Sequence, residues 1–142
     1  MMRRKGFTLV ELVVVILILG ILAGVAAPKM LNTSAKATDN GIKQTLAIVR
    51  DAIELYQANN GGNLPPCNVT GSDFIPLVQP YIRGALFPKS PLAAPAVASQ
   101  VKGVATTTAD NSTGWMYNTG TGEFIVNSNA ASASGAGLYS TF

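Results

Sequence analysis

The sequence contains no histidine and only one cysteine, Cys67. A zinc site needs spaced Cys and His ligands, and a disulfide within one chain needs two cysteines, so the sequence excludes both. Charge is also scarce, because only 12% of the residues are charged and the seven acids are spread from Glu11 to Glu123. No catalytic set and no metal-ligand set emerges, and we expect the protein not to be an enzyme.

What the sequence does contain is a long apolar run near its start. From residue 7 to residue 27 the only charged residue is Glu11, and a bilayer-spanning helix needs roughly 20 apolar residues. A carboxylate at the centre of such a helix costs about 2.5 to 3.5 kcal/mol, so it should have a function and a partner. A secretory signal ending at Val25-Ala26-Ala27 fits less well, because its apolar region is shorter and Pro28 would follow the cut. A simple anchor with Glu11 reaching toward the interface is a second alternative.

A free amino terminus would supply the partner for Glu11. Cleavage between Gly6 and Phe7 places a new α-amine one helical turn from Glu11, and the amine of a neighbouring copy could reach the same carboxylate. At ~4 Å and an effective dielectric near 20, two opposite charges attract by about 4 kcal/mol, which offsets the cost of burying the carboxylate.

The residues Lys5-Gly6-Phe7-Thr8-Leu9, followed by Glu11, resemble the processing signal of type IV pilin-like proteins, which are the type IV pilins and the pseudopilins of type II secretion. The resemblance implies that a prepilin peptidase cuts between Gly6 and Phe7 and methylates the Phe7 amine. It also implies that Phe7 and Glu11 act in assembly. The implied partners are further copies of the chain, the prepilin peptidase, an inner-membrane assembly platform, minor pilins or pseudopilins, and the lipid bilayer.

The resemblance leaves two kinds of filament open. Many type IV pilins carry a C-terminal disulfide loop, which the single Cys67 cannot form, and this favours a major pseudopilin of type II secretion. The Asp-Pro-Trp-Gly sequence common in major pseudopilins is absent, however, and Lys89-Ser90-Pro91-Leu92 stands near its place. A major or minor type IV pilin, acting in motility, adhesion or DNA uptake, is therefore the alternative.

Calcium is the only cofactor that the resemblance suggests, since major pseudopilins often bind it in a C-terminal loop. Asp110-Asn111-Ser112 offers three oxygen-bearing side chains, whereas calcium takes six to eight oxygens. We therefore expect no cofactor and assign no metal site.

The chain divides into a leader (residues 1–6), a membrane and filament-core helix (7–27), the amphipathic half of the same helix (28–58) and a head (59–142). The leader's Arg3, Arg4 and Lys5 favour the cytoplasmic side, so we expect a single-pass inner-membrane protein whose head is periplasmic or extracellular, later part of an extracytoplasmic filament. Without the leader, seven basic residues face seven acids, and no nucleic-acid binding is expected. A membrane-anchored binding module is a further alternative, and a DNA-binding form of it would need a basic patch of Arg83, Lys89 and Lys102.

Helical spacing continues beyond the apolar run and predicts one helix from residue 7 to about residue 58. The stripe consists of Leu31, Ala35, Thr38, Ile42, Leu46, Val49, Ile53 and Tyr56. Asp39 and Lys43, and likewise Arg50 and Glu54, are spaced for ion pairs on the opposite face. Gly20, Gly24 and Pro28 predict a loosened segment between residues 20 and 28, as the resemblance implies for assembled filaments; ordinary membrane-helix glycine and proline are the alternative.

The remaining chain predicts an α+β pilin-like fold in which the long N-terminal helix packs on a small antiparallel sheet. We expect a short broken helix around residues 74–82 with Ser72 as a possible cap, a weak strand at 100–105 and a β-hairpin near the C-terminus. The hairpin residues Trp115, Tyr117, Phe124 and Val126 should form the head core against the long helix. The small-residue segment 130–137 should be mobile or wrapped on a neighbour.

Overall fold

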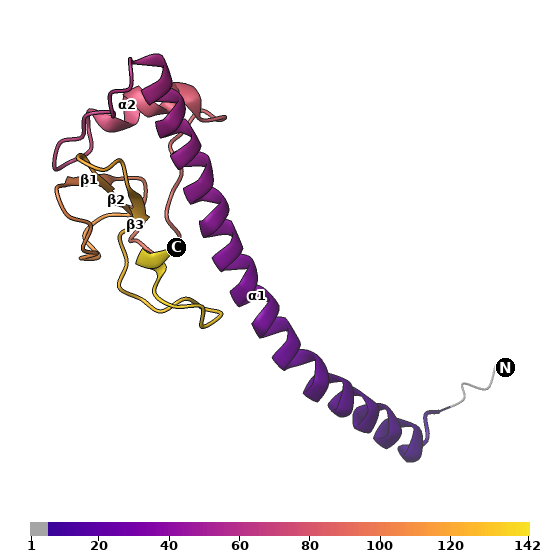
Figure 1. Cartoon of the computed structure of the whole chain (residues 1–142). Helices are drawn as coiled ribbons and strands as arrows, with labels where there is room; N and C mark the ends of the chain where they lie inside the picture. Colours follow the sequence, from indigo (N-terminus) through magenta and orange to yellow (C-terminus); the bar gives the residue numbers. More distant parts are fainter. Residues whose placement is uncertain (1–5) are drawn as a thin grey trace.

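The fold is dominated by one long helix, α1, which runs from Leu9 to Asn59. A computed structural model describes residues 6–142, without the side chains of residues 27–29, 31 and 32; the predicted roles of Arg3, Arg4 and Lys5 lie outside the described residues. At 1.5 Å per residue, the 51 residues of α1 span about 77 Å. Its second half lies along a small head, and its first half projects away from it (Figure 1).

α1 ends where the sequence predicts a stop. Gly61 and Gly62 both have positive φ angles, +65° and +85°, which glycine adopts without steric cost. The Gly62 N–H donates to the carbonyl of Gln57 over 2.9 Å, and this bond caps the last turn. The glycine pair therefore turns the chain back toward the head.

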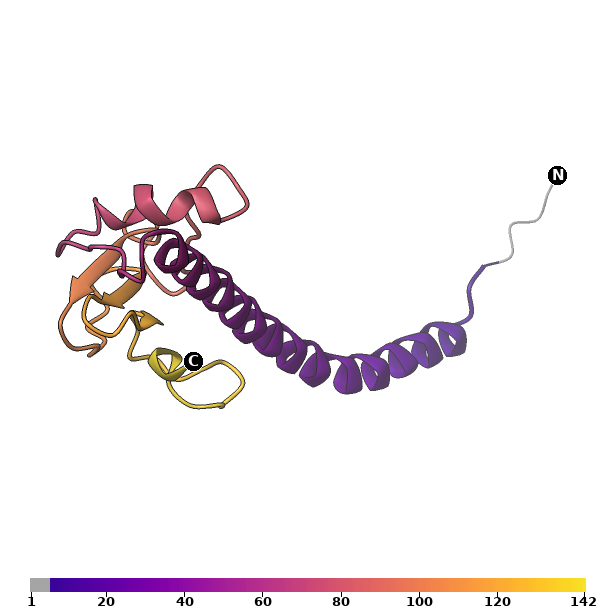
Figure 2. The ribbon, with the colours of Figure 1, turned by 45° about the horizontal axis from the view of Figure 1, so that its top comes forward.

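The predicted loosening around Gly20, Gly24 and Pro28 is not seen in the single chain, because α1 is helical without interruption across these residues. Proline removes one backbone donor and crowds the carbonyl four residues earlier, but the flanking turns keep their bonds. Figure 2 shows that α1 is bent along its length. Loosening in an assembled filament stays a prediction.

The head-facing stripe of α1 is confirmed over its outer part. Ile42, Leu46, Val49 and Ile53 are buried, and Ala52 joins them. Nearer the membrane end the stripe was placed too early, since Thr38 is exposed and Ala35 is only half-buried. The side chain of Leu31 lies outside those that the structure describes, and Tyr56 is half-buried. Among the described side chains of α1, the buried ones begin at Asp39.

The predicted broken helix consists of α2 (Phe74–Val78) and the 3₁₀ turn η1 (Gln79–Tyr81). Pro76 and Pro80 are tolerated because the first N–H groups of a helix have no partner within the helix. Ser72 is not the cap. Asp73 occupies that position, and the Ser72 hydroxyl instead accepts a hydrogen bond from the Asn68 side chain.

Three short strands form the sheet in the order β1-β2-β3: β1 (Val101–Val104), β2 (Trp115–Asn118) and β3 (Phe124–Val126). The predicted hairpin is confirmed as the antiparallel pair of β2 and β3, and the weak strand is β1. The prediction of an all-antiparallel sheet was wrong, because β1 pairs with β2 in parallel. The chain between them, residues 105–114, returns to the starting edge of the sheet, as parallel pairing requires.

The head core lies where α1, α2 and β3 meet. Trp115, Tyr117, Phe124 and Val126, the residues expected there, are all 0% exposed. The ring centroids of Phe74 and Tyr117 are 4.6 Å apart and those of Trp115 and Phe124 5.5 Å apart, distances typical of favourable aromatic pairs.

The C-terminal segment is bonded to α1, so the expectation that residues 130–137 are mobile was wrong. The alternative, that the segment wraps on a neighbour, stays a prediction. The buried Asp39 carboxylate accepts hydrogen bonds from the N–H groups of Ala133 and Ser134, from the Ser134 hydroxyl and from the Tyr139 hydroxyl at 2.8 Å. Tyr139 begins the 3₁₀ turn η2 (Tyr139–Thr141). A carboxylate that receives several donors is well satisfied when buried, so Asp39 holds the segment in place.

The two ion pairs predicted along α1 were wrong. Asp39 serves the C-terminal segment, and the Lys43 ammonium lies 4.3 Å from the centroid of the Phe142 ring. The Arg50 guanidinium donates to the carbonyl oxygens of Phe124 and Phe142 at 2.8 and 2.7 Å. These side chains join α1 to distant parts of the chain instead of pairing along the helix.

Candidate processing and assembly site

The first turn of α1 is closed by a reciprocal pair of hydrogen bonds between Thr8 and Glu11. The Thr8 side chain accepts from the Glu11 N–H at 3.3 Å, while the Glu11 carboxylate accepts from the Thr8 N–H at 2.9 Å and from its hydroxyl at 2.7 Å. This arrangement is a capping box, which satisfies N–H groups that a helix start leaves without partners. Glu11 is therefore held at the helix end before any second chain is present.

Thr8 is the residue that sequence reasoning missed. Its signal was readable, because Thr-x-x-Glu before an apolar run is the sequence pattern of a capping box. The assembly role predicted for Glu11 and the methylated Phe7 amine stays a prediction, since in the uncut chain the Phe7 nitrogen belongs to a peptide bond.

The predicted cleavage point lies in irregular, exposed chain. Gly6 and Phe7 precede the helix, and Phe7 is 82% exposed. An added Cβ at Gly6 would meet no atom within 4 Å. Exposed backbone outside regular structure is the kind of segment that proteases cut, so the Gly6–Phe7 bond is open to a peptidase.

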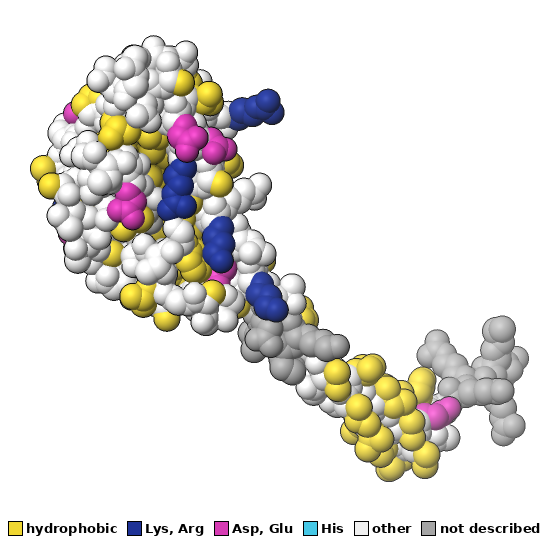
Figure 3. All heavy atoms as spheres, viewed as in Figure 1, with side chains coloured by type: hydrophobic (Ala, Val, Ile, Leu, Met, Phe, Trp, Pro, Cys, Tyr) yellow, Lys and Arg dark blue, Asp and Glu magenta, His cyan; other side chains and the backbone are white. Residues whose placement is uncertain are grey.

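The first half of α1 presents an uncovered apolar surface. The segment Leu9–Ala26 has a mean hydropathy of 2.9, and none of it is buried inside the chain. Figure 3 shows apolar side chains covering this end of the molecule, with an acidic group beside them at the helix start. The segment is long and apolar enough to cross a membrane.

Comparison with known proteins finds a known sequence motif at the N-terminal end of the chain. The prokaryotic N-terminal methylation motif matches residues 1–27. The chain carries a prepilin-type N-terminal motif. It is 39% identical over 67 residues to the type IV narrow pilus major component PilA5 of Thermus thermophilus, a match that spans 47% of this chain and 57% of that protein.

The other relatives include type II secretion proteins. Core protein G of Klebsiella pneumoniae is 37% identical over 60 residues, with 42% of this chain and 43% of the relative covered. Core protein G of Pectobacterium carotovorum is 33% identical over 84 residues, with 57% and 53% covered. The chain thus matches about half the length of these relatives, which include both type IV pilins and type II secretion pseudopilins. No solved structure gives a significant match.

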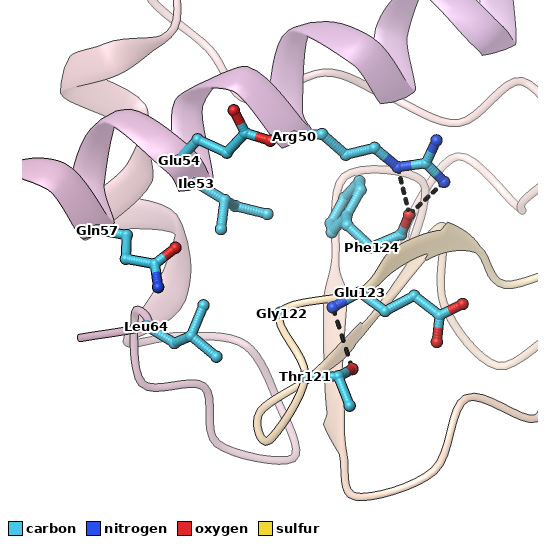
Figure 4. A pocket seen from close by; sticks show the side chains of 9 residues that line it. All are labelled: Arg50, Ile53, Glu54, Gln57, Leu64, Thr121, Gly122, Glu123 and Phe124. Atoms are coloured by element: carbon cyan, nitrogen blue, oxygen red, sulfur yellow. Dashed lines mark hydrogen bonds between the residues drawn. The ribbon is translucent and has the colours of Figure 1, made fainter. Parts of the chain in front are cut away.

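A cleft of about 310 Å³ lies between α1 and the β2–β3 hairpin. Figure 4 shows Arg50, Glu54 and Gln57 on the helix side, and Glu123 on the hairpin side. The side chains do not converge on one point, because Arg50 bonds the Phe124 carbonyl and Glu123 accepts a hydrogen bond from Thr107 at 2.5 Å. The cleft therefore shows no arrangement suited to acid–base catalysis.

The basic patch required for DNA binding loses one of its three members. Lys102 forms an ion pair with Asp110, so its charge is neutralised within the chain. Arg83 and Lys89 are both exposed, but two lysine or arginine side chains make a weak electrostatic footprint for nucleic acid.

Cys67 lies in a loop and is half-buried. Burial, assisted by the negative charge of Asp73, raises the pKa of its thiol to about 12. Because the thiolate is the reactive form, this environment disfavours chemistry at Cys67.

The side chains of the Asp110-Asn111-Ser112 loop are engaged in hydrogen bonds within the chain. The Asp110 carboxylate is surrounded by donors: the Lys102 ammonium, the N–H and hydroxyl of Ser112, and the Asn127 amide nitrogen. The Asn111 side-chain oxygen already accepts the Asn129 N–H at 2.9 Å. Calcium needs oxygens directed at it, and within residues 6–142 no group of three or more His, Cys, Asp or Glu residues could hold a metal ion.

Proposed function

We propose that the chain is a structural subunit of a helical filament assembled from the inner membrane. A prepilin peptidase cuts it between Gly6 and Phe7 and methylates the new Phe7 amine, while the head faces away from the cytoplasm. The observation that carries this proposal is the exposed apolar segment Leu9–Ala26. Its first turn contains Glu11, which forms a capping box with Thr8, and the accessible Gly6–Phe7 bond precedes it.

The apolar segment Leu9–Ala26 needs apolar surroundings, which the described residues 6–142 do not supply. Lipid provides them before assembly, and the same segments of neighbouring copies provide them in a filament. Close packing drives helix association in that setting, because lipid is already as apolar as leucine. Filament cohesion thus depends on many small contacts, together with a few polar ones.

Glu11 supplies the polar contact. The capping box uses one oxygen of the Glu11 carboxylate, Oε2. Within the described residues 6–142, the other oxygen, Oε1, accepts no hydrogen bond. The Phe7 amine of an adjoining subunit is the cation that fits there. At ~4 Å, such a pair contributes about 4 kcal/mol at an effective dielectric near 20.

Of the two filament types, we propose a type II secretion pseudopilus. The single Cys67 rules out a C-terminal disulfide loop, and relatives named core protein G come from several organisms. A type IV pilus is the second candidate, favoured by the match to PilA5. Its partners in either filament are further copies, minor subunits and the inner-membrane assembly platform.

Intact-mass analysis of detergent-extracted protein, from cells with and without a prepilin peptidase, tests the processing step. We expect a species that starts at Phe7 and is one methyl group heavier, found only with the peptidase. A Gly6→Val variant should remain full length. A full-length wild-type chain in peptidase-containing cells, or one that starts near Pro28, contradicts the proposal.

Deletion of the gene separates the two filament types. Loss of exoenzyme release with normal twitching and adhesion indicates a pseudopilus. Loss of twitching or adhesion with normal exoenzyme release indicates a pilus.

A further inference from the structure

A lysine side chain of β1 forms an ion pair with the segment that connects β1 and β2. Lys102 lies on β1 opposite Met116 of β2, and its ammonium pairs with Asp110 in the connecting segment. The Lys102 and Asp110 side chains are 26% and 39% exposed, so the pair lies at the surface of the head but is partly shielded. It links the strand to the loop that must return the chain for parallel pairing.

Asn127, just beyond β3, holds the same loop from the other side. It is 2% exposed, and its amide oxygen accepts the N–H groups of Asp110 and Asn111 at 2.7 and 3.2 Å. Its amide nitrogen donates to the Asp110 carboxylate at 2.7 Å and to the Thr113 hydroxyl at 2.9 Å. Because the Asn127 amide oxygen accepts these two N–H groups, the amide nitrogen is the atom that faces the Asp110 carboxylate.

The donors of this loop leave no place for a metal ion at Asp110. Oδ1 receives Ser112 and Asn127, and Oδ2 receives Lys102. The Lys102 ammonium, followed by the Ser112 and Asn127 donors, holds the pKa of Asp110 well below its usual range. The carboxylate is therefore charged and already neutralised at neutral pH.

We propose that the Lys102 ammonium takes the part that a bound divalent cation would take in this loop. It neutralises Asp110, closes the β1–β2 connection against Asn127, and makes the head stable without calcium. This departs from the calcium-binding loop that the resemblance to major pseudopilins suggests. The proposal for Lys102 concerns only the folded head, so its test does not depend on whether the chain forms a filament.

Thermal unfolding of the full-length chain in detergent, followed by Trp115 fluorescence, tests the proposal. The wild-type Tm should be the same in EDTA and in millimolar CaCl₂, and calorimetric titration with CaCl₂ should give no binding heat. A Tm that rises with calcium or falls in EDTA overturns the proposal.

Variants test the role of the ammonium. Lys102→Met keeps most of the side-chain length but removes the charge, and Tm should fall by roughly 4 °C or more, the size of shift that a loss of about 1 kcal/mol gives in a small domain. Lys102→Arg should retain most of the wild-type Tm. Lys36→Met, on an exposed lysine of α1, is the matched control and should change little.

A thermodynamic cycle with Asp110→Asn completes the test. If Lys102 and Asp110 act together, the double variant should lose clearly less than the sum of the two single losses. Additive losses, or a Lys102→Met variant with the Tm of the wild type, contradict the proposal.

Discussion

At the scale of single residues, charged side chains of α1 act over long stretches of sequence. Asp39 binds Ala133 and Ser134, which lie 94 and 95 positions away. The i,i+4 spacing predicted a local partner instead, because spacing reports only neighbours on the same helix. What the sequence could not reveal is which distant backbone N–H groups the fold brings to each charge.

Acid should release the contact between Asp39 and the C-terminal segment. The Ser134 hydrogen bond, followed by those from Tyr139 and the backbone, holds the Asp39 pKa below its usual value despite burial. A lowered folded-state pKa gives stability that is complete above the unfolded pKa of about 3.9 and is lost as pH falls through the folded pKa. We therefore expect Tm to drop below about pH 4.

Asp39→Asn isolates this contribution. At neutral pH it should lower Tm by several degrees, because an amide nitrogen then faces N–H donors, and its Tm should fall less steeply in acid than that of the wild type. Measurement of Tm between pH 3 and pH 7 checks both points, and identical acid profiles for the two proteins would contradict this role.

Gly71 is a position where no side chain fits. Its φ is +68°, and an added Cβ would lie 2.1 Å from the carbonyl oxygen of Val101. Strain from the left-handed conformation and from overpacking should cost about 2 to 5 kcal/mol in Gly71→Ala. Gly120→Ala is the matched control, because its nearest contact is 3.5 Å away, and it should cost less than about 0.5 kcal/mol. Urea unfolding of both variants measures the difference.

At the scale of elements, periodic patterns identified the helices and the hairpin. Spacings of three and four located the buried side of α1 from Ile42 to Ile53, and alternation located the paired strands around Trp115 and Phe124. Strand direction was a different matter. The sequence of a four-residue strand such as β1 does not indicate whether it pairs in parallel or antiparallel. That direction depends on the path of the connecting residues 105–114.

Arg50 joins α1 to β3 and to Phe142, so its replacement should destabilise the head. Its guanidinium reaches carbonyl oxygens at β3 and at Phe142 from one position on α1. We expect Arg50→Met to cost about 1.5 to 3 kcal/mol, as for hydrogen bonds to a charged group. Arg50→Lys should recover only part, since an ammonium lacks the planar fork of donors.

Urea unfolding of the Arg50 variants beside Asp51→Ala, a change on an exposed α1 side chain, provides the measurement. Full recovery by lysine would show that charge alone matters at this position, and no loss in Arg50→Met would contradict the joining role.

At the scale of the whole molecule, the chain has two halves with different requirements. The outer half of α1 and the head bury their apolar side chains against each other in one core, and Figure 1 shows them packed together. None of the residues that the structure describes covers the inner half, Leu9–Ala26. The apolar run with its one acid is visible in the sequence without any tertiary contact. Sequence reasoning did not predict the capping box, in which Thr8 positions that acid.

Glu11→Gln separates the two roles of Glu11. Glutamine can still accept the Thr8 N–H and so keeps the capping box, but it cannot form an ion pair with a neighbour's Phe7 amine. Glu11→Ala removes both. Thr8→Ala removes the hydroxyl contacts of the capping box and keeps both the charge of Glu11 and the backbone N–H that donates to it.

The decisive measurement is the amount of filament sheared from cells that express Glu11→Gln, beside intact-mass analysis of the same protein in the membrane. The account predicts a chain that is cut at Phe7 and methylated normally, with filament yield reduced at least tenfold, since about 1.4 kcal/mol of lost pairing already corresponds to that factor. Thr8→Ala should retain more filament than Glu11→Gln. Filaments formed by Glu11→Gln at the wild-type level would contradict the account.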